Sequence, residues 1–119
     1  SVGKRKLSRL TPLQKFMKAA DQVSLAHKDA FVELTLCLKE YLESSFSLRI
    51  RGKTSREIMK ELAPVEELRE HLPEIRSWLD ECDYLKFSGN EGSMERRQEL
   101  FLSLKSLAES IDATKGGKT

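Results

Sequence analysis

Apolar residues recur at intervals of three and four along most of this 119-residue chain, and this spacing constrains the fold more than any other feature. The first such series comprises Leu13, Phe16, Met17, Ala20, Val23, Ala30, Phe31, Leu34, Leu38, Tyr41 and Leu42. Intervals of this kind place side chains on one face of an α-helix, whereas a half-buried strand needs strict alternation. The sequence has no alternating run of useful length and no internal repeat. It therefore predicts an all-α fold without a sheet.

Two capping boxes mark helix starts, at Thr11-Pro12-Leu13-Gln14 and at Thr54-Ser55-Arg56-Glu57. In each, a threonine side chain can accept from the backbone amide three residues later, where Gln or Glu can return the bond. A single helix over residues 12–46 would be about 52 Å long, and would protrude from a compact domain of this size. We therefore expect a bend or break around residues 24–29, with a longer helix after it that ends near Ser45.

The second half of the chain divides into shorter pieces. The pattern predicts a connector at residues 46–53, a helix from Thr54 to Pro64, a short helical piece over 65–72, a helix over 73–87, a loop over 88–92 and a last helix from Ser93 to about Ile111. The expected fold is a compact bundle of four to six helices, with one long helix near the N-terminus. Its expected organisation is a basic leader (1–11), a single helical domain (12–112) and a disordered tail (113–119).

The formal net charge of +2 is distributed unevenly. The first ten residues carry four basic side chains and no acid: Lys4, Arg5, Lys6 and Arg9. Residues 115–119 add two lysines, whereas residues 11–114 hold 15 basic and 19 acidic residues. A mildly acidic body disfavours nucleic-acid binding by bulk electrostatics.

The leader does not resemble a secretory signal, because it lacks the apolar stretch of 7–15 residues that such a signal needs. No apolar run approaches the ~20 residues that span a bilayer. The chain begins without methionine, and we expect it to be a piece of a longer protein. Its two cysteines, Cys37 and Cys82, lie within apolar-periodic segments, which favours buried free thiols in a reducing compartment over a disulfide.

The connector gathers basic residues close to a predicted helix start: Arg49, Arg51, Lys53 and Arg56. Backbone donors and the helix dipole attract anions at such a position. A phosphate-binding loop is not expected, because Ser47 stands where that motif needs a glycine. The four residues are therefore candidates for contact with an acidic partner or a lipid headgroup, and a solvated loop is the alternative.

Residues for catalysis or metal binding are few. His27 and His71 have no partners at metal-ligand spacing, and Asp80 and Asp83 are one helical turn apart without a histidine. No Ser-His-Asp or Cys-His grouping follows from the spacing. We expect no enzymatic activity, no metal and no cofactor.

A helix-turn-helix near residues 54–87 is the alternative function, that of a small DNA-binding regulator. The helix predicted over 73–87 carries four acidic residues against two basic ones, and such a surface repels phosphate.

Three segments, in this order, resemble a known family. Residues 30–46 are similar to a pattern f-x-x-L…L-x-x-Y-L-x-x-x-F, residues 54–58 to T-x-x-E-I/L, and residues 79–89 to L-x-x-x-D-x-x-K-F-A/S-G. A closing helix like 96–111 follows. The order resembles the C-terminal cytoplasmic domain of BatD-like proteins of the Bacteroides aerotolerance (Bat) operon, over residues 30–111.

The resemblance implies an inner domain of a bacterial membrane protein, on the cytoplasmic face of the inner membrane and without enzymatic activity. It implies a MoxR-type AAA+ ATPase and von Willebrand factor A proteins as partners in envelope assembly or stress tolerance. The basic leader fits a flank that follows a membrane helix and contacts the anionic inner leaflet; a basic leader of a soluble protein is the alternative. We expect structural roles for the matching residues Tyr41, Thr54, Glu57, Asp83, Lys86 and Phe87.

Overall fold

The structure is a computed structural model that describes residues 9–87 and 92–116. Its helices in chain order are α2 (Pro12–Asp21), α3 (Ala30–Phe46), α4 (Ser55–Leu62), the 3₁₀-helix η1 (Glu66–His71), α5 (Leu72–Phe87) and α6 (Met94–Gly116). No strand occurs within these two described ranges. The prediction of an all-α bundle of four to six helices is confirmed.

The helices begin where the capping residues predict. The amide of Gln14 donates to Thr11 Oγ1 (3.1 Å), and the Thr11 amide donates to Gln14 Oε1 (2.9 Å). The same reciprocal pair joins Thr54 and Glu57 at 3.3 and 2.9 Å. Ser93 Oγ accepts from a backbone amide in the first turn of α6 (3.0 Å). Both predicted capping boxes are therefore confirmed, and Ser93 caps α6 where the last helix was predicted to begin.

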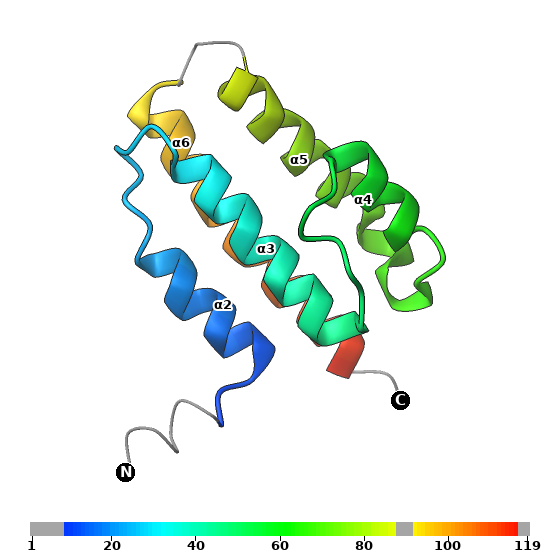
Figure 1. Cartoon of the computed structure of the whole chain (residues 1–119). Helices are drawn as coiled ribbons and strands as arrows, with labels where there is room; N and C mark the ends of the chain where they lie inside the picture. The colour runs from blue at the N-terminus through cyan, green and yellow to red at the C-terminus, as the bar shows by residue number, and fades with distance from the viewer. Residues whose placement is uncertain (1–8, 88–91, 117–119) are drawn as a thin grey trace.

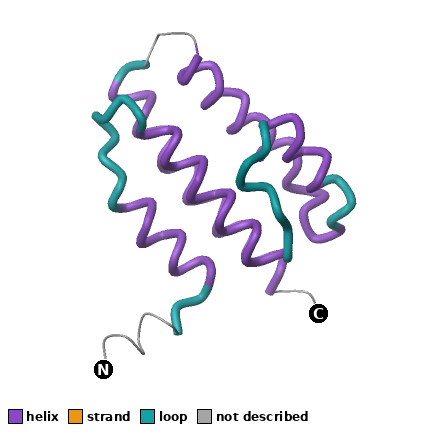
Figure 2. Tube along the Cα trace, in the orientation of Figure 1, coloured by secondary structure: helices purple, strands orange, loops and turns teal. Residues whose placement is uncertain are grey.

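Helix α3 lies at the centre of the bundle. It packs against α2 on one side, α5 on the other and α6 behind, as Figures 1 and 2 show. Because it has neighbours on three sides, buried side chains surround most of it: Ala30, Phe31, Leu34, Thr35, Cys37, Leu38, Tyr41 and Leu42. Short α4 packs on α5, and the molecule measures 40 × 38 × 24 Å.

The prediction that the long helix lies near the N-terminus is wrong. Residues 22–29 separate α2 from α3, in agreement with the expected break, and α3 has only 17 residues. The longest described helix is instead α6, with 23 residues. Its sequence has no proline or glycine before Gly116, and it packs along α2, α3, α5 and η1. The break itself is held by α6, because Arg97 Nη2 donates to the His27 carbonyl (2.7 Å).

The predicted start of a disordered tail at residue 113 is too early, because α6 continues through Gly116. Thr114 Oγ1 lies 2.8 Å from His71 Nε2, which joins the last turns of α6 to η1. This contact supplies a reason for order that the small, polar sequence does not show. Residues 117–119 lie outside the described residues.

The stability of the bundle depends on the inner face of α6, which two leucines of that helix can test. Leu104 is 0% exposed, whereas Leu102 is 60% exposed. We expect Leu104→Ala to lower the free energy of unfolding by about 2–5 kcal/mol, because it leaves a cavity in the core. Leu102→Ala, the matched control, should change it by less than about 0.5 kcal/mol. Urea denaturation measures both, and equal losses would contradict this packing.

Candidate interaction surfaces

The connector is held against α3 by two charged side chains of that helix. The Glu43 carboxylate accepts from the backbone amides of Ile50 (2.7 Å) and Arg51 (2.8 Å). Lys39 Nζ donates to the carbonyls of Arg51 and Lys53, both at 3.0 Å. The bond from the Ile50 amide lowers the pKa of the Glu43 carboxyl below its ordinary value, and burial lowers the pKa of Lys39. The sequence shows these two residues four apart, but not that the connector folds back over them.

Two of the four basic residues predicted to contact an anion or a partner are already paired within the chain. Arg51 Nη2 lies 3.2 Å from Glu43 Oε1 and 3.7 Å from Glu40 Oε2. Lys53 Nζ lies 3.1 Å from Glu61 Oε2. These acids come from α3 and α4, so the positive charge of the connector is partly neutralised by the helices that flank it.

The other two basic residues are exposed and lie apart from this network. Arg49 belongs to the connector, whereas Arg56 lies in the first turn of α4 and lines a depression beside α5. In the part of the chain that the structure describes, neither forms an ion pair. The four predicted residues therefore do not converge on one site, because local acids and different elements divide them.

Replacing the Glu43 carboxylate tests the connector clamp, by which we mean the bonds from Lys39 and Glu43 to the backbone of the connector. We expect Glu43→Gln to lower the free energy of unfolding at pH 7 by about 1 kcal/mol, because charge-assisted bonds to two amides are weakened. A folded-state pKa below the unfolded value of about 4.3 gives stability that is present above that value and is lost as the pH falls. Between about pH 6 and 3 the wild type should therefore lose more stability than Glu43→Gln. Glu109→Gln, at an exposed site of α6, is the control; parallel pH curves would contradict the clamp.

A ridge of exposed apolar side chains lies on α3 beside the clamp. Val32 and Leu36 are 51% and 41% exposed. Together with Lys39 and Glu43 they follow at intervals of four, three and four, so the four side chains share one stripe of the helix. The connector is held over the second half of this stripe, and none of the described elements covers Val32 and Leu36 in the first half. The ridge was not predicted from the sequence, although two apolar residues outside the periodic face of residues 30–46 were an available signal.

Tyr41, the first residue of the family-like motifs, packs in the core. Its side chain is buried, and its ring meets Phe16 edge-on with 6.0 Å between centroids. Its hydroxyl donates to Asp112 Oδ1 (2.8 Å) and so joins α3 to α6. Burial, followed by the bond to the carboxylate, raises the pKa of Tyr41 well above its ordinary value. The contacts of Tyr41 are those of a structural residue.

The remaining motif residues lie on α4 and α5. Thr54 and Glu57 form the capping box of α4. Asp83 Oδ1 and Lys86 Nζ form an ion pair of 3.3 Å across one turn of α5. Phe87 ends α5, and its side chain lies outside the described residues.

Both cysteines are buried free thiols, as the sequence predicts. Burial raises the pKa of Cys37 to about 11 and raises the pKa of Cys82 further. A thiol with a high pKa and little access to solvent is a poor nucleophile. The thiols are therefore core residues.

Thiol accessibility provides a test of this burial. At pH 8 we expect both thiols of the native protein to react slowly with a disulfide reagent such as Ellman's, and rapidly in denaturant. Since Cys82 is more deeply buried, the Cys37→Ala variant should react more slowly than Cys82→Ala. Because both folded pKa values are raised, stability should fall as the pH rises above about 8.5, where unfolded thiols ionise. Fast labelling of native Cys82 would contradict the packing.

The histidines do not form a metal or catalytic centre with each other. His71 is buried against Thr114, whereas His27 Nδ1 accepts from the Asp29 amide (3.1 Å) in the loop before α3. In the described ranges, no three His, Cys, Asp or Glu side chains lie close enough together to hold a metal ion.

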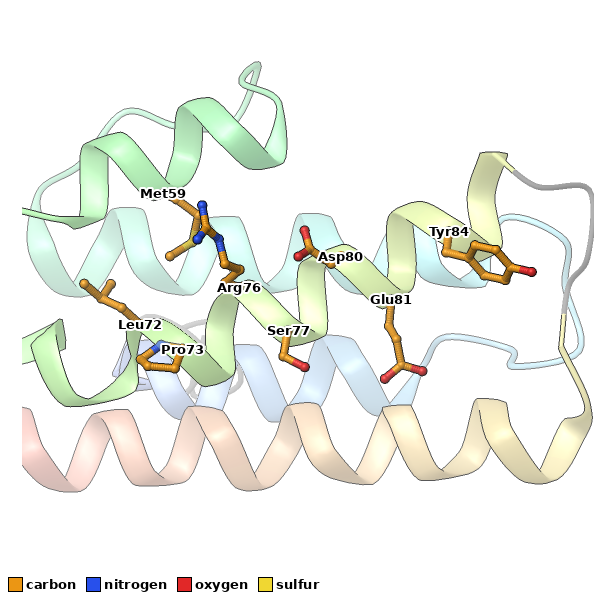
Figure 3. A pocket seen from close by; sticks show the side chains of 8 residues that line it. All are labelled: Met59, Leu72, Pro73, Arg76, Ser77, Asp80, Glu81 and Tyr84. Carbon is orange, nitrogen blue, oxygen red and sulfur yellow. The ribbon is translucent and has the colours of Figure 1, made fainter.

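A shallow depression runs along the outward face of α5 and has a volume of about 760 Å³. Its lining residues are Met59, Leu72, Pro73, Arg76, Ser77, Asp80, Glu81 and Tyr84. Met59 comes from α4 and the others from α5; in Figure 3 Asp80 lies on the side of α5 that faces α4, and Glu81 on the side that faces α6. Tyr84 is 61% exposed, so a large aromatic ring is available at one end.

The charges of this α5 face are only partly paired. Glu81 pairs with Arg96 of α6, whose guanidinium also contacts Glu99 at 2.8 Å. Arg76 and Asp80 are exposed and form no hydrogen bond or ion pair in the described part of the chain. This outward face was not predicted from the sequence, although Tyr84 among polar residues was an available signal.

Comparison with protein-family models, with curated proteins and with solved structures finds no significant match to the chain. None of the described helices combines the length and apolar character that a membrane crossing requires. Of the basic leader, Arg9 is described and exposed, whereas Lys4, Arg5 and Lys6 lie outside the described residues.

Proposed function

We propose that this chain is a non-enzymatic interaction domain of a membrane-anchored, Bat-type protein at the cytoplasmic face of the bacterial inner membrane. It acts there with a MoxR-type AAA+ ATPase and von Willebrand factor A proteins in envelope assembly or stress tolerance. The family and these partners rest on the resemblance of residues 30–111. The observation that supports a role in protein binding is the apolar ridge of α3, uncovered beside the clamped connector.

The ridge and its surroundings have the composition of a protein interface. Val32 and Leu36 supply an exposed apolar centre, and such a centre with a polar rim is typical of specific contacts. Arg49 and the partly neutralised Arg51 lie on the connector that borders it. A partner surface that is apolar at its centre and acidic at its edge fits this arrangement. In the proposal, the connector therefore contributes charge at the rim.

The leader is assigned to the membrane surface. Lys4, Arg5, Lys6 and Arg9 precede the first described helix, which begins at Pro12. A basic residue close to an anionic leaflet contributes about 1 kcal/mol of attraction. The leader would thus hold the bundle close to the bilayer.

Co-purification with the candidate partners tests the proposal. We expect the domain to retain a MoxR-type ATPase or a von Willebrand factor A protein at micromolar concentration. Leu36→Asp should weaken retention about tenfold or more, because a charge would be buried at the centre of the contact. Leu102→Asp, at the exposed leucine of α6, is the matched control and should bind like the wild type.

Two results would contradict the proposal. Retention of an unrelated protein, with none of the candidates bound, would remove the assigned partners, and equal binding by both leucine variants would remove the ridge. Duplex DNA binding that weakens steeply with salt and survives deletion of residues 1–10 would instead support the DNA-binding alternative. The exposed Glu74 and Asp80 on α5 disfavour that outcome, because they would face phosphate.

A further inference from the structure

The outward face of α5 has the spacing of a helix that packs against another helix. Pro73, Ser77, Asp80 and Tyr84 follow at intervals of four, three and four, and all four are exposed. This is the spacing that lines one side of a helix–helix contact. In Figure 3 α4 lies on one side of this face and α6 on the other, and the space in front of it is open. The face is therefore accessible to a further helix.

Arg76 and Asp80 have no partner among the described residues, and their spacing makes two antiparallel copies of this face complementary in charge. Arg76 and Asp80 are four residues apart, about 6 Å along the helix axis. If a second α5 lies antiparallel, with a two-fold axis midway between them, each Arg76 faces the Asp80 of the second copy. The contact then occurs twice, as the symmetry of such a dimer requires. One orientation therefore pairs both charges that have no partner among the described residues of a single copy.

The same axis also pairs the apolar ends of the face. Tyr84 lies eight residues after Arg76, and Leu72 lies eight residues before Asp80. Around an axis at the level of residue 78, Tyr84 of one copy therefore lies opposite Leu72 and Pro73 of the other. Near the axis the outward residue is Ser77, which is small enough to allow two helices to approach.

We propose that two copies of this chain associate through antiparallel α5 helices, with Arg76 of each copy paired with Asp80 of the other. A second copy fits the α5 depression because one two-fold axis satisfies three features at once: it pairs the charges, places Tyr84 opposite an apolar end, and puts the small Ser77 near the axis. An interface built on one helix and its borders is small, so the dimer is weak and concentration-dependent. The ridge of α3 lies on a different helix and stays available to another partner.

Sedimentation analysis of the full 119-residue chain, from micromolar to millimolar concentration, tests the dimer. We expect Arg76→Asp and Asp80→Arg each to raise the dissociation constant about tenfold or more, because each places like charges opposite one another twice. The double variant, with both changes, should restore dimerisation. An equimolar mixture of the two single variants should form a mixed dimer, because an acidic face then meets a basic one.

Two charge reversals elsewhere serve as matched controls. Arg49→Asp and Glu109→Arg change the charge equally at exposed sites of the connector and α6, and should dimerise like the wild type. Circular dichroism should show the same helix content in all variants. A wild type that stays monomeric at concentrations on the order of 1 mM would overturn the inference. Single variants that dimerise like the wild type would overturn it as well, and so would a mixture of the two variants that forms no mixed dimer. Binding of a different protein to this face, without self-association of the chain, would also overturn it.

Discussion

The burial of α3 against three other helices is the constraint on which the rest of the structure depends. Leu34, Leu38 and Leu42 of this helix are each at most 1% exposed, and Tyr41 connects it to α6 through Asp112. Because α3 contacts α2, α5 and α6, the positions of all three follow from its packing. The stripe of α3 that runs from Val32 to Glu43 holds the connector on its second half, and the apolar side chains of its first half stay exposed among the described residues.

Several charged residues in this domain hold loops in place through bonds to the loop backbone. Lys39 and Glu43 hold the connector through its backbone, and buried Arg97 holds the break before α3 while lying over the Phe31 ring. Charge of this kind is used within the fold and is not available for a ligand. The exposed charges Arg76 and Asp80 form no such contact within the described residues and stay available to a partner.

Local features of the fold could be predicted from the sequence, because they depend on neighbours within a few residues. Thr11 and Thr54 mark helix starts through bonds that span three residues, and the apolar periodicity identifies Leu34, Leu38 and Leu104 as core residues. The length of α6 and the two surfaces could not be predicted in this way. They depend on which residues distant in sequence are brought together, such as His71 with Thr114.

The sequence by itself determined the helical class, the helix starts, the break after α2 and the burial of both thiols, since periodicity and capping are local properties. Only the tertiary structure decided that Arg51 and Lys53 are paired with acids, that Val32 and Leu36 are exposed, and that two charges on the open face of α5 have no partner among the described residues. The physical reason is that exposure and charge pairing are properties of the assembled bundle. Whether a side chain outside the buried face of a helix is exposed or holds another segment depends on which elements pack over it in the folded chain.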